Sequence, residues 1–256
     1  MKKRGLLYII FGLIFYLLFL VIQLPASWFA WGLNNFTHGT VRVDPIAGSM
    51  WHGTGRLVIY YPQGVPHDLG SAEWRINLLW LFTGRIQMYW HAESADGRTS
   101  TVLRFGKNQA QLLETEASFP AQAVGSFYPP ASLISPKGQV IVRTEKLTIS
   151  NNGVEGVAEI SWQNAGSSLT NVQPLGDYRL EINSAGTTAD LKLTTLHGSL
   201  ELTGQGQWQL QNGQFHLTGA ATPRERANEL EPMLNLLGPA QDGGHRPLSL
   251  NGRLSL

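Results

Sequence analysis

The residue types that could perform chemistry are scattered along this chain of 256 residues. There is no cysteine and no H-E-x-x-H pair, so no set of zinc ligands is visible. Segment 47–51, AGSMW, places Ser49 after a glycine but does not form the G-x-S-x-G elbow of a nucleophilic serine. We therefore predict no enzymatic activity, no catalytic residue, no bound metal and no cofactor. The histidines are His38, His52, His67, His91, His197, His216 and His245.

Two glycine pairs deserve comparison with nucleotide-binding loops. Gly53-Thr-Gly55 and Gly204-Gln-Gly206 lack the third glycine and the strand-to-helix context of a dinucleotide loop. We interpret them as glycines at strand ends or bulges. His216 lies between Phe215 and Leu217 on the polar side of an alternating segment, which predicts an exposed surface histidine.

Three tryptophans offer a more informative pattern. Trp74, Trp80 and Trp90 lie within one apolar stretch, SAEWRINLLWLFTGRIQMYW. One interpretation is core packing of a β domain. The other is an apolar face or groove that contacts a partner subunit or a lipid chain, because a domain with few helices leaves apolar strand faces to be covered.

The charge balance excludes one class of partner. The chain carries 19 Lys+Arg against 18 Asp+Glu, and Lys2, Lys3 and Arg4 supply three of the positive charges. The remainder, with 16 basic against 18 acidic residues, is slightly acidic. Such a surface does not match a phosphate backbone, so we predict no nucleic-acid binding.

The N-terminal region predicts a membrane anchor. Segment 5–24 has no charged residue and, at ~1.5 Å per residue, forms a helix ~30 Å long, which matches the hydrocarbon core of a bilayer. The basic tip, 1–4, precedes it and the next cation is Arg42, so the tip stays in the cytoplasm. Segment 25–40 is then a linker whose Trp28 and Trp31 lie in the far interface. These features predict a single-pass protein of the inner membrane with a periplasmic C-terminal domain.

A cleaved signal peptide is the competing interpretation. Its apolar core has 7–15 residues and ends at a small-x-small site. Here the apolar core is longer, and Leu24-Pro25-Ala26 is a poor cleavage site. Retention of the anchor is favoured.

From residue 41 to residue 256, apolar and polar residues alternate. Ile86, Met88 and Trp90, for example, alternate with polar neighbours, which is typical of antiparallel strands with one wet face. Asp96-Gly97, Asn152-Gly153 and Asn212-Gly213 are turn signals between such runs. The fold class is therefore mainly β: a periplasmic antiparallel sheet domain, either a sandwich or an open groove, with one or two short helices. A division into two halves near 131–138 stays open.

Two stretches predict these helices. Thr222-Pro-Arg-Glu225 has the form of a capping box, and Gly238 is a natural stop. Pro232 should kink the helix or restart it. The second stretch is 119–128, which ends before Pro129-Pro130. Between the capping box and the stop, one apolar face is formed by Ala227, Leu230, Leu234 and Leu237.

Four places in the sequence resemble the type II secretion system protein N family. They are the basic N-terminus with its single apolar segment, AGSMWHGTG at 47–55, WRIN at 74–77 through TGR at 83–85, and LEPMLNLLGP at 230–239 followed by Gly252-Arg-Leu. The resemblance implies an accessory inner-membrane subunit of the machine that moves folded proteins from the periplasm across the outer membrane. Its implied partners are other subunits of that system, and it implies no catalytic residues.

A second resemblance covers about half of the chain. Pieces such as W-x-φ-x-φ-L-φ-x-G-x-φ, where φ is apolar, are similar to strand units of AsmA-like envelope proteins. That resemblance implies an apolar groove for lipid. The alternative function is therefore a periplasmic lipid-binding or lipid-shuttling protein.

Overall fold

The computed structural model describes residues 2–39, 41–59, 67–95, 97–127, 129–241 and 244–253. It forms two compact units, Met1–Ala95 and Asp96–Leu256. Asp96, in one predicted turn, lies outside the described residues. The segment 131–138, where the sequence suggested a division, lies inside the second unit, between two strands that pair from Gln109–Ser150 to Pro120–Gln139.

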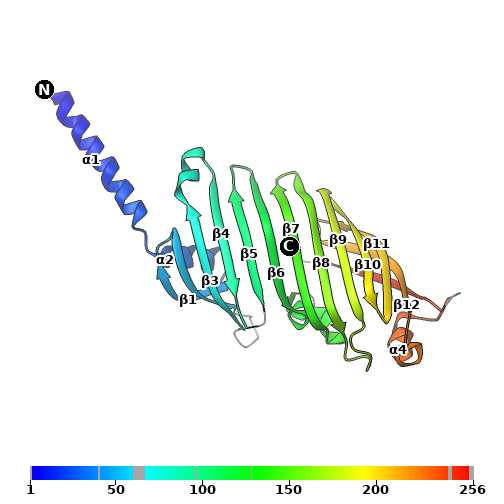
Figure 1. Ribbon diagram of the computed structural model, residues 1–256. Helices are drawn as coiled ribbons and strands as arrows, with labels where there is room; N and C mark the ends of the chain where they lie inside the picture. Colours follow the sequence, from blue (N-terminus) through cyan, green and yellow to red (C-terminus); the bar gives the residue numbers. More distant parts are fainter. Residues whose placement is uncertain are drawn as a thin grey trace. The chain divides into compact units, whose positions relative to one another are not determined.

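The first unit contains two helices followed by a meander of four strands, as far as its residues are described (Figure 1). Each strand pairs antiparallel with the next one along the chain. The elements are α1 (Lys2–Ile22), α2 (Ala26–Phe36), β1 (Val41–Gly48), β2 (His52–Ile59), β3 (His67–Asn77), the 3-10 helix η1 (Leu78–Thr83) and β4 (Ile86–Glu93).

Helix α1 contains most of segment 5–24, for which the sequence predicts a membrane span. Among the described residues, no helix combines the length and the apolar character that crossing a membrane requires. Segment 25–40, predicted as a linker, is mostly folded, because α2 occupies eleven of its residues.

The second unit continues the same design with nine described strands, again paired antiparallel in chain order (Figure 1). Short helices stand between β6 and β7 and before β13. The elements are β5 (Arg98–Phe105), β6 (Gln109–Pro120), η2 (Ala121–Ala123), α3 (Val124–Phe127), η3 (Pro129–Ile134), β7 (Lys137–Ser150), β8 (Gly153–Gly166), β9 (Gly176–Gly186), β10 (Thr188–Gly198), β11 (Leu200–Gln209), β12 (Gln214–Pro223), α4 (Ala227–Leu234), η4 (Asn235–Leu237) and β13 (Arg246–Arg253).

The mainly β fold is thus confirmed, and of the two predicted architectures the strands form the open one. They lie side by side, and each unit places most of its apolar strand residues on one side. In the second unit, α4 and the loop before β9 cover part of that side: Leu230 and Val172 are fully buried against Tyr178 and Leu200.

The helix after β12 is confirmed, but its predicted start is wrong. Thr222 and Pro223 belong to β12, where they pair with Glu201 and Leu200, so no capping box forms. The helix begins at Ala227 after Arg226, whose positive φ turns the chain out of the strand. Leu230 and Leu234 face the core as expected, and Gly238 ends the 3-10 turn that extends the helix. The stretch 119–128 is only partly helical because β6 extends to Pro120.

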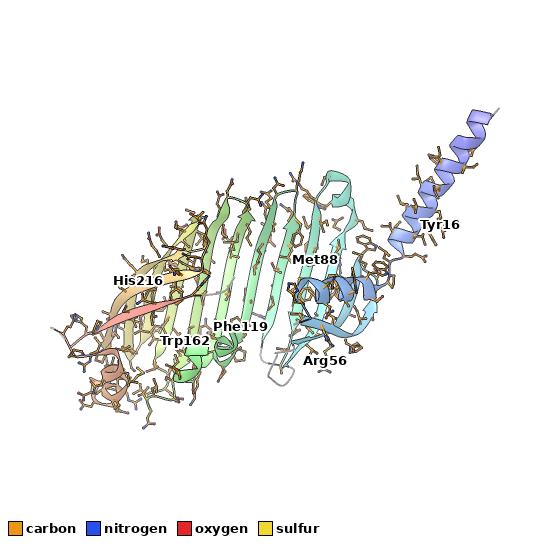
Figure 2. The ribbon with its side chains drawn as sticks, turned by 180° about the vertical axis from the view of Figure 1, so that it is seen from behind. Tyr16, Arg56, Met88, Phe119, Trp162 and His216 are labelled. Atoms are coloured by element: carbon orange, nitrogen blue, oxygen red, sulfur yellow. The ribbon has the colours of Figure 1, made fainter. Side chains whose placement is uncertain are left out.

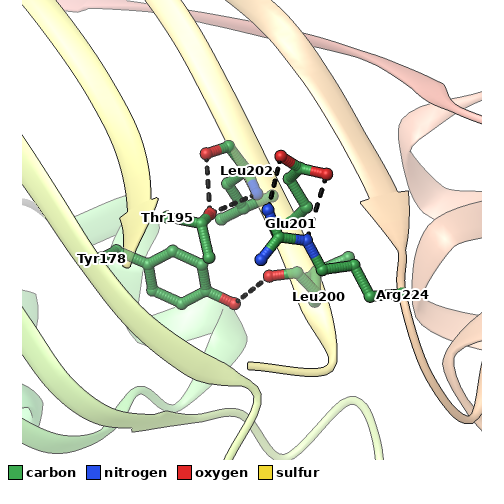
Figure 3. A network of polar contacts seen from close by, with 6 residues as sticks. All are labelled: Tyr178, Thr195, Leu200, Glu201, Leu202 and Arg224. Carbon is green, nitrogen blue, oxygen red and sulfur yellow. Dashed lines mark hydrogen bonds and ion pairs between the residues drawn. The ribbon is translucent and has the colours of Figure 1, made fainter. Parts of the chain in front are cut away.

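Side-chain hydrogen bonds replace missing backbone hydrogen bonds where the pairing of β10 with β11 becomes irregular. Their regular backbone register ends at the pair Leu193–Gly204. Beyond it, the Thr195 hydroxyl donates to the carbonyl of Leu202 at 2.8 Å and accepts from its N–H at 2.7 Å (Figure 3). The Tyr178 hydroxyl donates to the carbonyl of Leu200 at 2.9 Å, and burial raises the pKa of this phenol. Backbone groups left over by the irregularity therefore have partners.

The opposite side of the strands in the second unit is mainly polar, and several ion pairs connect neighbouring strands there. Glu116 lies between two guanidinium groups, 3.3 Å from Arg143 and 3.6 Å from Arg98. Glu201 on β11 and Arg224, just after the end of β12, form a two-pronged ion pair (Figure 3). Arg143 donates a hydrogen bond to Glu116, and this is the main reason that the pKa of that carboxyl is lowered. Opposite charges at neighbouring strand positions support the strand register.

We expect the Glu116→Gln substitution to reduce the loss of unfolding free energy that occurs as the pH falls below neutral. The pKa of Glu116 in the folded chain lies below its ordinary value of 4.5. A carboxyl with a lowered folded pKa stabilises the fold above its unfolded pKa and loses that contribution as the pH falls through the folded pKa. Because solvent screens the pair, the change should not exceed about 1 kcal/mol. Urea midpoints at neutral pH and at about pH 3 measure it; an equal reduction from Glu145→Gln, at an exposed carboxylate on β7, would contradict the assignment.

Candidate interaction surfaces

A tryptophan lies at the centre of the first unit. Trp74 on β3 is fully buried and pairs across the sheet with Trp90 on β4. Phe29 from α2 stacks on the Trp74 indole, with ring centroids 4.2 Å apart and planes inclined by 11°. Figure 2 shows α2 lying across this side of the strands, near Met88. The helix thus covers the apolar side of the first sheet.

The third predicted tryptophan lies elsewhere. Trp80 is half-buried in η1, and its carbonyl accepts a hydrogen bond from the Thr83 hydroxyl at 2.7 Å. The structure therefore brings Trp74 and Trp90 together and leaves Trp80 apart. The buried position of Trp74 fits core packing, and contact between Trp74 and a partner would require α2 to move. A partner or lipid contact for the three tryptophans stays a prediction.

The glycines of segment 47–55 make room for this core. A Cβ on Gly53 would lie 2.4 Å from the Trp74 ring, and one on Gly55 would lie 2.2 Å from a methyl group of Val43. Gly53 pairs directly with Trp74, and Gly55 with Ala72. Gly53 is the second residue of β2, and Gly55 pairs with Ile46 where the register of β1 and β2 shifts, so both lie at a strand end or an irregularity as predicted. Close packing is the reason for a glycine at each position.

The turn between β1 and β2, residues 48–51, caps the C-terminal end of α1; we name it the capping turn. The Met50 N–H donates to the carbonyl of Leu24, and the Trp51 indole N–H donates to the carbonyl of Val21, each at 2.8 Å. The Val21 carbonyl lies in the last turn of α1, where carbonyls have no donor within the helix, so the Trp51 bond caps it; Leu24 lies just after the helix. The Trp74 indole donates to Met50 at 3.0 Å, which links the turn to the core.

In the second unit, one part of the apolar side has no cover among the described residues. The buried clusters there gather over β8–β13, under α4. On the same side of β5–β8, Val140 and Ala165 are buried near one end of their strands, but the apolar side chains farther along are half-buried or exposed, with Phe105 41% and Ile149 42% exposed. We name this surface the apolar strip. It consists of Leu103, Phe105, Leu112, Val142, Leu147, Ile149, Val154, Ala158 and Ile160.

The polar side of β9–β13 contains a hollow of about 1080 Å³. Within it, Gln207 donates to the Asp190 carboxylate at 3.2 Å, and His216 bonds to Asn251. His216 is exposed on this side, as the sequence predicts. Among the described residues, no three His, Cys, Asp or Glu side chains gather where they could hold a metal ion.

Sequence reasoning missed two residues of these sites. Phe29 was not recognised as the cover of Trp74, although Ala26, Phe29, Ala30 and Leu33 follow helical spacing. Trp51 is part of segment 47–51, but no role was predicted for it. An indole N–H can cap a helix carbonyl, but Trp51 lies far along the chain from Val21, so the sequence does not show this pairing.

These features define a class: an open β-meander protein that offers surfaces for contact, preceded by an apolar helix. The comparison with known families is more specific. The chain matches the family described as type II secretion system (T2SS), protein N, over residues 39–249, and it belongs to that family. The resemblance carried by AGSMWHGTG and WRIN is thus confirmed, and these two motifs meet where Gly53 pairs with Trp74. Neither the curated proteins nor the solved structures contain a match.

Gly53→Ala should destabilise the first unit because the added methyl group collides with the Trp74 ring. Overpacking of this kind costs about 1–3 kcal/mol. Gly32→Ala is the matched control, since a Cβ there meets nothing within 4 Å and alanine favours a helix over glycine by about 1 kcal/mol. Urea unfolding of the full chain in detergent measures both; equal stabilities for the two variants would refute the packing role of Gly53.

Proposed function

We propose that this chain is an accessory or scaffold subunit of a type II secretion system, anchored in the inner membrane, that contributes to export of folded proteins across the outer membrane. The family match over residues 39–249 carries the proposal. The open sheets support it, because both present a polar surface, and the second also presents the apolar strip, on which other subunits of the system can assemble. The proposed partners are those subunits in the inner membrane and the periplasm.

The proposed anchor is segment 5–24. Its support is the absence of charge in the sequence and the exposure of its side chains. Every large apolar residue from Tyr8 to Ile22 is exposed by at least 44%. Exposing so much apolar surface to water is unfavourable by about 25 cal/mol per Å². With residues 1–4 in the cytoplasm, residues 41–256 then lie in the periplasm.

Deletion of the gene should reduce release of secreted proteins, and the full chain should restore it. Residues 25–256 exported behind a cleaved signal peptide should restore it less well, because the anchor is missing. Exoprotein activity in the medium, compared with the periplasmic fraction, measures release. Unchanged secretion of every substrate in the deletion strain would count against the proposed role.

Alkaline phosphatase fused after Leu256 checks the orientation in the same cells. The enzyme is active only outside the cytoplasm, so an active fusion agrees with a periplasmic C-terminal domain. An inactive fusion that is expressed at full length would refute that orientation, whatever the secretion assay gives.

The apolar strip favours a second candidate function, lipid binding. The strip has no charged side chain, and along β7 it extends from Val142 to Ile149. At ~3.3 Å per residue this length is roughly that of a fatty acyl chain. Ala158 in the strip, and Ala110 and Ala117 beside it on the same side, have small side chains that leave room for a ligand.

If lipid occupies the strip, residues 25–256 should carry lipid that native mass spectrometry detects. The fragment starts at Pro25 because α2 is part of the core. Ile149→Asp should remove the lipid, because a carboxylate next to an acyl chain is poorly solvated. Val157→Asp is the control, since Val157 is 55% exposed on the opposite side of the neighbouring strand. A wild-type fragment without lipid would exclude this candidate.

A further inference from the structure

Helix α2 has two apolar sides, and only one of them is used within the unit. Its inner side packs on the first sheet through Ala26, Phe29 and Leu33. Its outer side exposes Trp28 by 55% and Trp31 by 61%, with their rings edge to face at a centroid distance of 6.2 Å. Two large exposed rings on one helix indicate a surface with an external partner.

The outer side of α2 lies close to the end of α1 along the chain and in space. Only Gln23, Leu24 and Pro25 separate the two helices. Pro25 forms a β-bridge with Ser49, while Met50 bonds to the carbonyl of Leu24 between the helices and Trp51 bonds to the carbonyl of Val21 in α1. The capping turn therefore holds the start of α2 at the end of α1, and α2 is not free to swing away.

The region also lacks charge. From residue 5 to residue 41 there is no Lys, Arg, Asp or Glu. The outer side of α2 can therefore approach a bilayer without desolvating an ion, which would be costly. Tryptophan is the side chain that best suits the headgroup boundary, because its ring is apolar and its N–H still finds a polar partner.

We propose that Trp28 and Trp31 dock α2 into the headgroup region of the bilayer that holds α1. The proposal rests on the membrane anchor of the proposed function. In this arrangement the α2 side of the first unit lies against the membrane, and no flexible linker separates the unit from α1. Lipid is favoured over a protein partner because the surface continues directly from α1, is uncharged and bears two tryptophans.

The absence of native cysteine allows a direct test on the full chain. Single cysteines at positions 28 and 31 receive a nitroxide label, and the chain is reconstituted in nanodiscs of phosphatidylcholine and phosphatidylglycerol. Collision with oxygen, which concentrates in lipid, is compared with collision with a water-soluble nickel complex. His91→Cys is the aqueous control, because His91 on β4 is exposed on the side of the sheet away from α2. Leu17→Cys reports on the anchor itself.

Docking predicts that labels at 28 and 31 favour oxygen several-fold over the label at 91. Labels at 28 and 31 that match position 91, with position 17 in lipid, would overturn the docking and leave the anchor intact. A water-exposed label at 17 would overturn both. Protection of 28 and 31 only in nanodiscs that hold two chains would identify a second copy as the occupant and refute docking on lipid.

Discussion

The first unit depends on one stack of side chains: Phe29 on the Trp74 indole, with Gly53 beneath it. The stack joins α2 to β2 and β3, and the indole N–H of Trp74 reaches the carbonyl of Met50. That bond places the capping turn, whose other donors reach the end of α1. One buried ring thus connects the sheet, the covering helix and the apolar helix, because an aromatic side chain combines a large buried surface with one directed polar group.

The second unit is stabilised by a buried apolar cluster at one end and by ion pairs between its strands. Leu230 and Leu234 from α4 cover one end of its apolar side, and ion pairs connect neighbouring strands on the polar side. Where β10 and β11 lose their register, the Thr195 hydroxyl replaces a backbone partner. The cover is incomplete because α4 contains only eight residues, and β5–β8 retain apolar side chains that face outward.

Much of this could be predicted from the sequence because strands and amphipathic helices leave periodic patterns. The alternation at Ile86, Met88 and Trp90 predicted β4, and the spacing of Leu230 and Leu234 predicted the buried side of α4. The start of α4 was wrong because a Thr-Pro-Arg-Glu sequence suits a helix start locally, while pairing of Thr222 with Glu201 depends on a distant strand. The contact of Phe29 with Trp74 was missed for the same reason: periodicity shows which side is apolar but not what covers it. The choice between sandwich and open sheet also needed coordinates, because the alternation is the same in both.

The strict chain order of the strands has a consequence for how the protein acquires its structure. Each strand finds its partner in the segment made just before it, as β8 does with β7 and β10 with β9 through connections of one or two residues. Closing such short loops costs little chain entropy, so assembly can proceed from the N-terminal end by adding one hairpin at a time. The N-terminal strands can therefore pair while the C-terminal part of the chain is still unfolded. At each stage the last strand to pair offers its free edge to the next strand along the chain.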